Sequence, residues 1–311
     1  DGAHLRVDVT RLVARGGAAQ AELTASARRD GTGGWSVTSR GRLDGFDPRP
    51  WWPGVDDHPL RRGPHRLALR WDGDVALAAT PSFATARGRA ELTIADSVIA
   101  GLPLAGTASW QRAPGAADGS AAVDVALAGN RLEATARASS PGQPMAWRAV
   151  LHAPRLVALR PLAPLDPALA AWLPTAGTVD ASLDGEGVWP DVRTRGDVRV
   201  QGLRVQDVTL AQALGRWTAA LDPLVRPDDP LELVLDVAGL ARGEQRLDRL
   251  RARVGGRWSA HTLELDASLP LRPPAWIESW PAPRGAATAV TADGTALRLR
   301  GDGRWTAGAA A

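Results

Sequence analysis

The stretch DPALAAWLPTAGTVDASLDGEG, residues 166–187, changes its hydrophobic period in the middle. Asp166 before Pro167 is a good helix N-cap followed by proline at the first helical position, and Pro174 ends the helix. From Gly177 onward apolar residues alternate with polar ones, which is the period of a strand with one apolar face. The stretch therefore predicts a short helical segment followed directly by a β-strand.

The same alternation recurs along the chain. Clear examples are RLALRWD (residues 66–72), LELVLDVAG (231–239) and TLELDASL (262–269). Strands with one apolar face are typical of antiparallel sheets, because strands of parallel sheets are usually apolar on both faces. No long helical period competes with them, so we predict an all-β fold, an elongated antiparallel sheet with short helices near residues 156–173 and 273–280.

Turn signals separate the alternating runs. Asp-Gly occurs at residues 72–73, 118–119, 184–185 and 293–294, and Gly-Asn at 129–130. These residues accept the positive φ that tight hairpins require, so we expect turns there. The apolar parity slips between Val205 and Val208, which indicates a bulge or a change of strand.

A weak internal repeat is present. The same succession of features, proline, tryptophan, proline, glycine, an alternating strand and Asp-Gly, starts at three places in the chain. These places are residues 47–54, 166–187 and 273–281. Trp52, Trp172 and Trp280 mark a unit of roughly 110–120 residues. We therefore divide the chain into the end of a preceding β repeat (1–46), two full repeats (47–160 and 161–272) and the start of another (273–311), and expect it to be an interior piece of a longer protein.

Composition excludes several functions. The pI is about 10.8, but the chain has no Lys, Tyr or Cys, so a net charge of only +3 raises it, and positive and negative residues are interleaved. This pattern argues against a nucleic-acid partner. The five histidines show no metal-site spacing, and no nucleotide-binding or nucleophile motif is present. We expect no metal, no cofactor and no enzymatic activity. We interpret the carboxylate pairs Asp56-Asp57 and Asp228-Asp229 as parts of solvated loops.

A one-faced sheet must cover its apolar side, or curl around something apolar. Short apolar helices could cover an edge or an open end of such a sheet. The residues expected to line the apolar surface are Leu67, Leu69, Trp71, Val198, Val200, Leu231, Leu233, Leu235, Leu263, Leu265, Leu297 and Leu299. The charged residues expected on the opposite face are Arg66, Arg70, Arg199, Glu232, Asp236, Glu264, Asp266, Arg298 and Arg300.

Residues 162–210 resemble the TamB family of translocation and assembly module proteins, within the wider AsmA-like group. The pattern is an apolar helix, alternating strand, Trp-Pro and a second alternating strand, filled here by Gly177, Val179, Ala181, Leu183, Gly185, Trp189, Pro190, Gly196, Val198, Val200, Leu203 and Val205. Residues 87–110 and 261–280 look like the central region of such proteins.

The resemblance implies a fold and a function. It implies a U-shaped β-groove (a β-taco) of repeated hairpin units that carries phospholipid acyl chains between the inner and outer membranes of a cell envelope. The expected location is the periplasm, with attachment to the inner membrane through a segment outside this chain. For some members it also implies outer-membrane protein assembly with an assembly barrel as partner. An aliphatic face also suits mobile lipid tails on physical grounds, because each CH₂ buried on it gains up to about 0.8 kcal/mol.

Other functions remain open at this point. The alternative is a structural or adhesive β-rich surface scaffold that transports nothing. A β-solenoid would show periods of about 20–30 residues, which we do not find. An outer-membrane barrel should carry aromatic girdles with many tyrosines, and the chain has none.

Overall fold

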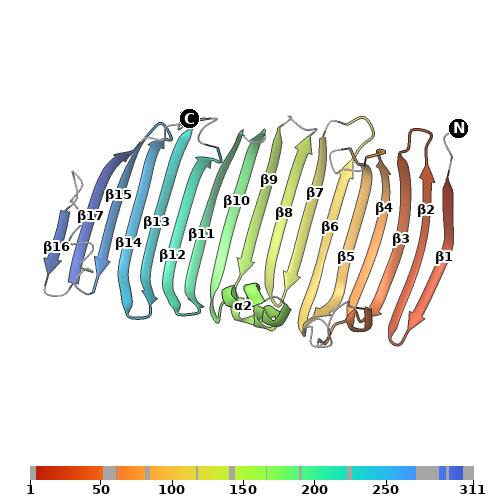
Figure 1. Cartoon of the computed structure of the whole chain (residues 1–311), viewed down its shortest axis with the longest axis horizontal. Coiled ribbons are helices and arrows are strands. Elements are labelled where there is room, and N and C mark those ends of the chain that lie inside the picture. Colours follow the sequence, from red (N-terminus) through yellow and green to blue (C-terminus); the bar gives the residue numbers. More distant parts are fainter. Residues whose placement is uncertain are drawn as a thin grey trace. The chain divides into compact units, whose positions relative to one another are not determined.

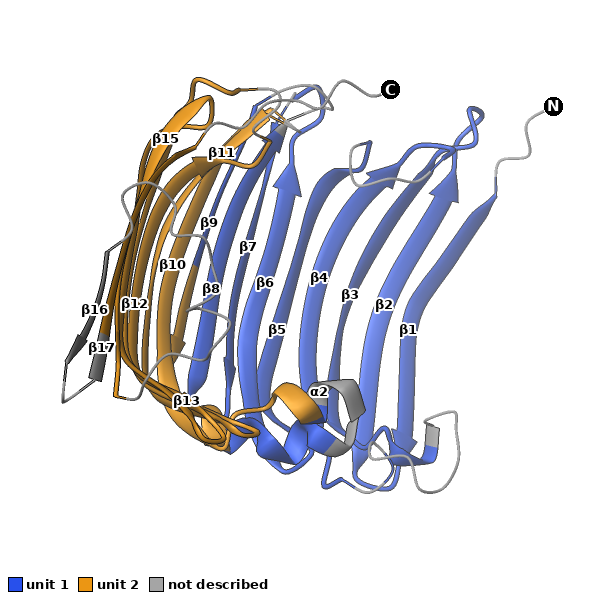
Figure 2. Ribbon diagram, turned by 60° about the vertical axis from the view of Figure 1, so that its left-hand side comes forward, with its two compact units in different colours: residues 1–149, 158–170 blue, residues 150–157, 171–311 orange. Residues whose placement is uncertain are grey.

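The computed structural model describes residues 5–51, 61, 63–80, 85–116, 118–139, 144–165, 167–188, 191–222, 226–270, 287–291 and 294–303. The chain groups into two compact units, coloured blue and orange in Figure 2. Unit 1 comprises residues 1–149 and 158–170, and unit 2 comprises residues 150–157 and 171–311. The predicted division into repeats remains a prediction.

Unit 1 is an antiparallel sheet in which each strand pairs with the next along the chain. Period-two alternation makes these segments strands, because it gives each a face for the apolar side and a face for water. They are β1 (Arg6–Gly16), β2 (Ala19–Arg29), β3 (Trp35–Phe46), β4 (Leu67–Leu77), β5 (Arg87–Ile99), β6 (Leu102–Arg112), β7 (Asp118–Leu127) and β8 (Asn130–Ser139). A short 3-10 helix, η1 (Arg49–Trp51), follows β3.

Unit 2 repeats this plan. Its strands are β10 (Ala176–Val188), β11 (Asp191–Val205), β12 (Val208–Ala220), β13 (Pro230–Arg242), β14 (Gln245–Arg257), β15 (Ala260–Leu269), β16 (Ala287–Thr291) and β17 (Gly294–Gly303). Strands β10 to β15 pair in sequence order, and β17 pairs with both β15 and β16. Figure 1 shows the ladder of hairpins.

The few helices lie where the sequence places them. The 3-10 helix η2 (Leu156–Leu165) and the helix α2 (Pro167–Trp172) follow β9 (Met145–Ala153), and these elements contain the residues at which the two units divide. This confirms the helical segment predicted near residues 156–173; the one predicted near 273–280 lies outside the described residues. The last turn of α2 contacts the β11–β12 turn, since Gln206 Nε2 donates to the Ala171 carbonyl at 2.9 Å. The predicted all-β fold, a curled antiparallel sheet with short inserted helices, is confirmed in each unit.

The strands of each unit curve along their length (Figure 2). The register shifts in three strand pairs of unit 1, and such irregularities bend a strand. In unit 2, Gly202 of β11 and Gly239 of β13 have φ of +58° and +63° inside their strands. The strand pairs on either side of each glycine place both glycines opposite Ala211 of β12. The two backbone irregularities therefore lie on one line across β11, β12 and β13.

Most of the predicted Asp-Gly turns are wrong. Asp72-Gly73 and Asp184-Gly185 lie inside β4 and β10, and Asp118-Gly119 begins β7. Cross-strand partners override the local signal, since Asp72 accepts a hydrogen bond from Arg40 Nε across the ladder at 2.5 Å. The turn predicted at Gly129-Asn130 lies one residue earlier, since Ala128 and Gly129 have positive φ and Asn130 begins β8. The slip at residues 205–208 is a change of strand from β11 to β12, and the pair at 293–294 lies partly outside the described residues.

Candidate functional site

The register of unit 2 gathers its large aliphatic side chains on one face, which we call the apolar face of unit 2. Directly opposed residues form rows across the strands, because neighbouring strands present matching residues to the same side of a sheet. The rows are Gly196, Trp217, Leu233, Val254 and Leu263; then Val198, Gly215, Leu235, Ala252, Leu265 and Leu299; then Val200, Ala213, Val237, Leu250, Ala267 and Leu297.

Unit 1 has an equivalent face, the apolar face of unit 1. One row runs through Leu12, Leu23, Gly41, Trp71, Leu92, Ala108, Val123 and Ala134. The next runs through Ala21, Leu43, Leu69, Ile94, Gly106, Val125 and Leu132. The structure therefore divides the predicted surface residues between two faces: Leu67, Leu69 and Trp71 belong to unit 1, and the other nine to unit 2.

The apolar face of unit 1 is partly accessible to solvent, and most side chains on that of unit 2 are half-buried. Leu12, Leu92, Val123 and Leu132 on the apolar face of unit 1 are 44%, 36%, 37% and 43% exposed. The buried hydrophobic side chains of the described residues are mostly alanines, and Ala213, Leu231, Ala252 and Ala267 among the buried residues lie on the apolar face of unit 2. Contiguous exposed apolar surface of this kind marks an interaction site in soluble proteins.

Two tryptophans lie over glycines on these faces. A Cβ built on Gly196 would lie 2.5 Å from Trp217 Cζ2, and one built on Gly41 would lie 2.7 Å from Trp71 Cη2. Each glycine is the direct cross-strand partner of its tryptophan. The indole ring occupies the space above the glycine that a side chain at that position would fill. The row of apolar side chains therefore continues across the glycine, which has no side chain of its own.

The opposite face of each unit is polar. All nine charged residues expected there lie at exposed or half-buried positions, and none is buried. Ion pairs join neighbouring strands, such as Arg251 Nε to Asp236 Oδ1 at 2.7 Å and Arg298 Nε to Asp266 Oδ1 at 2.7 Å. Because these pairs are exposed, they add little to stability and mainly keep this face wet.

Ionised partners hold two carboxyl groups below their usual pKa. Arg193 donates to both oxygens of Asp229, at 2.7 and 2.9 Å, and this hydrogen bonding lowers the pKa of Asp229. The hydrogen bonds from Arg131 lower the pKa of Asp124 in the same way. The neighbouring Asp228 accepts from Ser259 Oγ at 2.7 Å, so the Asp228-Asp229 pair is engaged by protein groups.

In the part of the chain that the structure describes, no group of three or more His, Asp and Glu side chains could hold a metal ion. His152 Nδ1 forms an exposed hydrogen bond with Asp180 Oδ1, and His261 Nδ1 lies 3.3 Å from the Trp258 carbonyl. His65 is buried and accepts a hydrogen bond from the Ala100 amide at 3.0 Å. Among the described helices, none is both long and apolar enough to cross a membrane.

Sequence reasoning missed several members of the apolar faces. These are Leu12, Leu23, Leu43, Leu92, Ile94, Trp217, Leu250 and Val254. Their signal is the same alternation used elsewhere, for example in AELTI and RLRARV, so a complete application of the rule would find them.

Comparison of the chain with protein-family models, with curated proteins and with solved structures finds no match in any of the three. The likeness to the TamB family therefore rests on the sequence pattern alone.

Proposed function

We propose that the two apolar faces bind phospholipid acyl chains, and that the protein is a lipid-transport segment of a cell envelope. The observation that carries the proposal is that rows of Leu, Val and Ile gather on one face of each unit, and that several of them are exposed in unit 1. An acyl chain needs a smooth apolar surface and no specific polar partner. Each CH₂ removed from water gains up to about 0.8 kcal/mol, so several together retain a lipid without a motif.

The resemblance to the TamB family supplies the setting of this proposal. On this resemblance we propose a location in the periplasm, with attachment to the inner membrane through a segment outside this chain. The resemblance also suggests an outer-membrane assembly barrel as a second partner. We also propose, from the sequence, that the protein has no enzymatic activity.

The proposal is tested by extracting lipids from the purified chain and identifying them by mass spectrometry. We expect phospholipid to copurify with the wild-type chain. Leu233→Arg should reduce its amount, because a guanidinium on the apolar face of unit 2 repels acyl chains. The matched control is Val234→Arg, since Val234 lies on the polar face of the same strand and is 38% exposed. Absence of lipid from the folded wild-type chain would favour a structural scaffold.

A further inference from the structure

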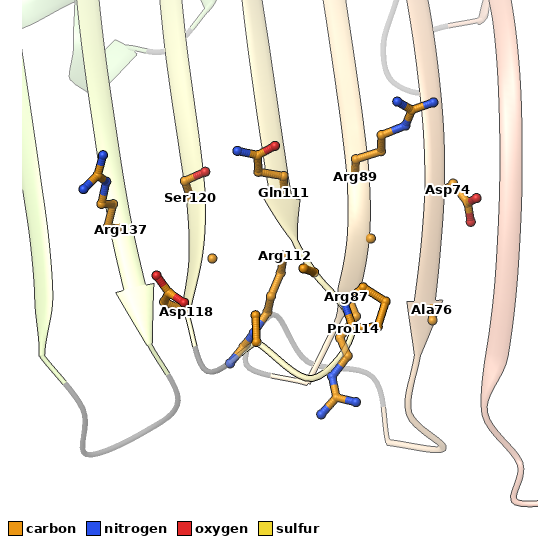
Figure 3. A pocket seen from close by; sticks show the side chains of 14 residues that line it. Asp74, Ala76, Arg87, Arg89, Gln111, Arg112, Pro114, Asp118, Ser120 and Arg137 are labelled. Atoms are coloured by element: carbon orange, nitrogen blue, oxygen red, sulfur yellow. The ribbon is translucent and has the colours of Figure 1, made fainter.

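One hollow on the polar face of unit 1 is rich in arginine. It has a volume of about 780 Å³ and lies over β4 to β8 near one end of these strands. Figure 3 shows its lining, with Arg137, Ser120, Gln111, Arg89 and Asp74 side by side on successive strands. Arg87, Arg112 and Asp118 also border the hollow, so four guanidinium groups face two carboxylates and the hollow carries net positive charge.

Three arginines of this hollow have no carboxylate partner among the residues that the structure describes. Some arginines elsewhere on this face are paired with carboxylates: Arg40 with Asp72, Arg42 with Glu22 and Arg131 with Asp124. Within the described part of the chain, no carboxylate lies within 4.0 Å of Arg87, Arg89 or Arg137. Three guanidinium groups are therefore available to an external anion.

The register shows how two of them can reach one ligand. Arg89 of β5, Gln111 of β6, Ser120 of β7 and Arg137 of β8 are direct cross-strand partners in one row. The outer two strands of such a row are about 14 Å apart. The side chains of Arg89 and Arg137, when both are extended toward each other, are together long enough to cover that distance and to meet over Gln111 and Ser120. In Figure 3 the guanidinium of Arg89 points away from Gln111, so meeting requires a rotamer change, which exposed side chains make within nanoseconds.

We propose that this hollow binds a phosphate group. Guanidinium groups match the oxygens of phosphate with paired hydrogen bonds, and the Ser120 hydroxyl and the Gln111 amide supply neutral donors between them. A phosphate offers enough oxygens to use both arginines and both neutral donors at once. The site lies on the face opposite the apolar face of unit 1, so it does not depend on acyl-chain binding there.

Titration calorimetry with inorganic phosphate, in about 0.1 M NaCl at neutral pH, tests the site. We expect saturable binding that weakens about tenfold or more in Arg89→Gln and in Arg137→Gln, since each variant loses charged hydrogen bonds to the anion. The matched control is Arg131→Gln, which removes the same charge from β8 but from an arginine already paired with Asp124. It should bind phosphate as the wild type does.

No saturable binding to the wild type, or equal weakening in all three variants, would overturn the proposal. Vesicles identify the source of the phosphate. Flotation compares vesicles of phosphatidic acid with vesicles of phosphatidylcholine. If only the phosphatidic acid vesicles carry the wild type, and they no longer carry Arg89→Gln, the phosphate is that of a lipid headgroup. If inorganic phosphate binds and neither vesicle does, the site takes a soluble phosphate.

Discussion

Gly196 of β11 and Trp217 of β12 face each other across the ladder, and the indole occupies the space that any larger residue at 196 would need. Gly41 and Trp71 stand in the same relation in unit 1. Trp71 Nε1 also donates to Ser39 Oγ at 2.9 Å, which orients that ring toward β3. In both units a tryptophan thus completes an apolar row at a glycine.

This arrangement predicts the effect of enlarging the glycine. Gly196→Val should destabilise unit 2 by about 1–3 kcal/mol, because its Cβ would meet both the indole and the Ser182 carbonyl, 2.6 Å away. Gly255→Ala on β14 is the control, since nothing lies within 4 Å of its added Cβ. Urea unfolding measures both. Equal stability of Gly196→Val and the wild type would mean that the indole does not lie over Gly196.

The open apolar face predicts tolerance of a charge. Leu92→Asp should remain folded, because Leu92 is 36% exposed and its replacement can be hydrated. Val192→Asp should unfold the chain, because Val192 is 1% exposed and an unpaired buried charge costs several kcal/mol. Circular dichroism and thermal melts of the two variants separate the cases. Unfolding of Leu92→Asp would show that this face is sealed.

The polar face predicts small effects on stability. Arg199→Ala and Glu232→Ala should change the free energy of unfolding by about 0.5 kcal/mol or less, because both side chains are exposed. Chemical denaturation gives the values. Losses of several kcal/mol at both positions would reverse our assignment of the two faces.

The Arg193–Asp229 pair predicts a dependence of stability on pH. The pKa of Asp229 is lowered in the folded state from its ordinary 3.8, so the ionised carboxylate stabilises the fold above that pH. This contribution is lost as the pH falls through the lowered pKa. Asp229→Asn should therefore cost about 1–2 kcal/mol at neutral pH, and the difference from the wild type should shrink below about pH 4.

Thermal melts between pH 7 and pH 2.5 record this difference. A gap between the two proteins that stays constant over the whole range would show that Asp229 is not stabilised by its charge.

Alternation alone predicts the two faces, because a period of two corresponds directly to the two sides of a strand. Leu233 and Val234 are adjacent in sequence and lie on opposite faces for this reason. The turns are less predictable, since Asp72-Gly73 lies in mid-strand through a pairing with β3 that no local signal contains. The Gly196–Trp217 contact and the line of backbone irregularities at Gly202 and Gly239 depend on register, which becomes visible only when the strands are aligned.

The most direct test of acyl-chain binding is photo-crosslinking from two adjacent positions. A photoreactive amino acid is placed at residue 233 or at residue 234 of the full chain, which is then irradiated with phospholipid vesicles and analysed by intact mass spectrometry. Both positions are accessible, Leu233 on the apolar face of unit 2 and Val234 on its polar face. We predict a phospholipid adduct at 233 and none at 234; equal labelling of both positions, or of neither, would contradict the account.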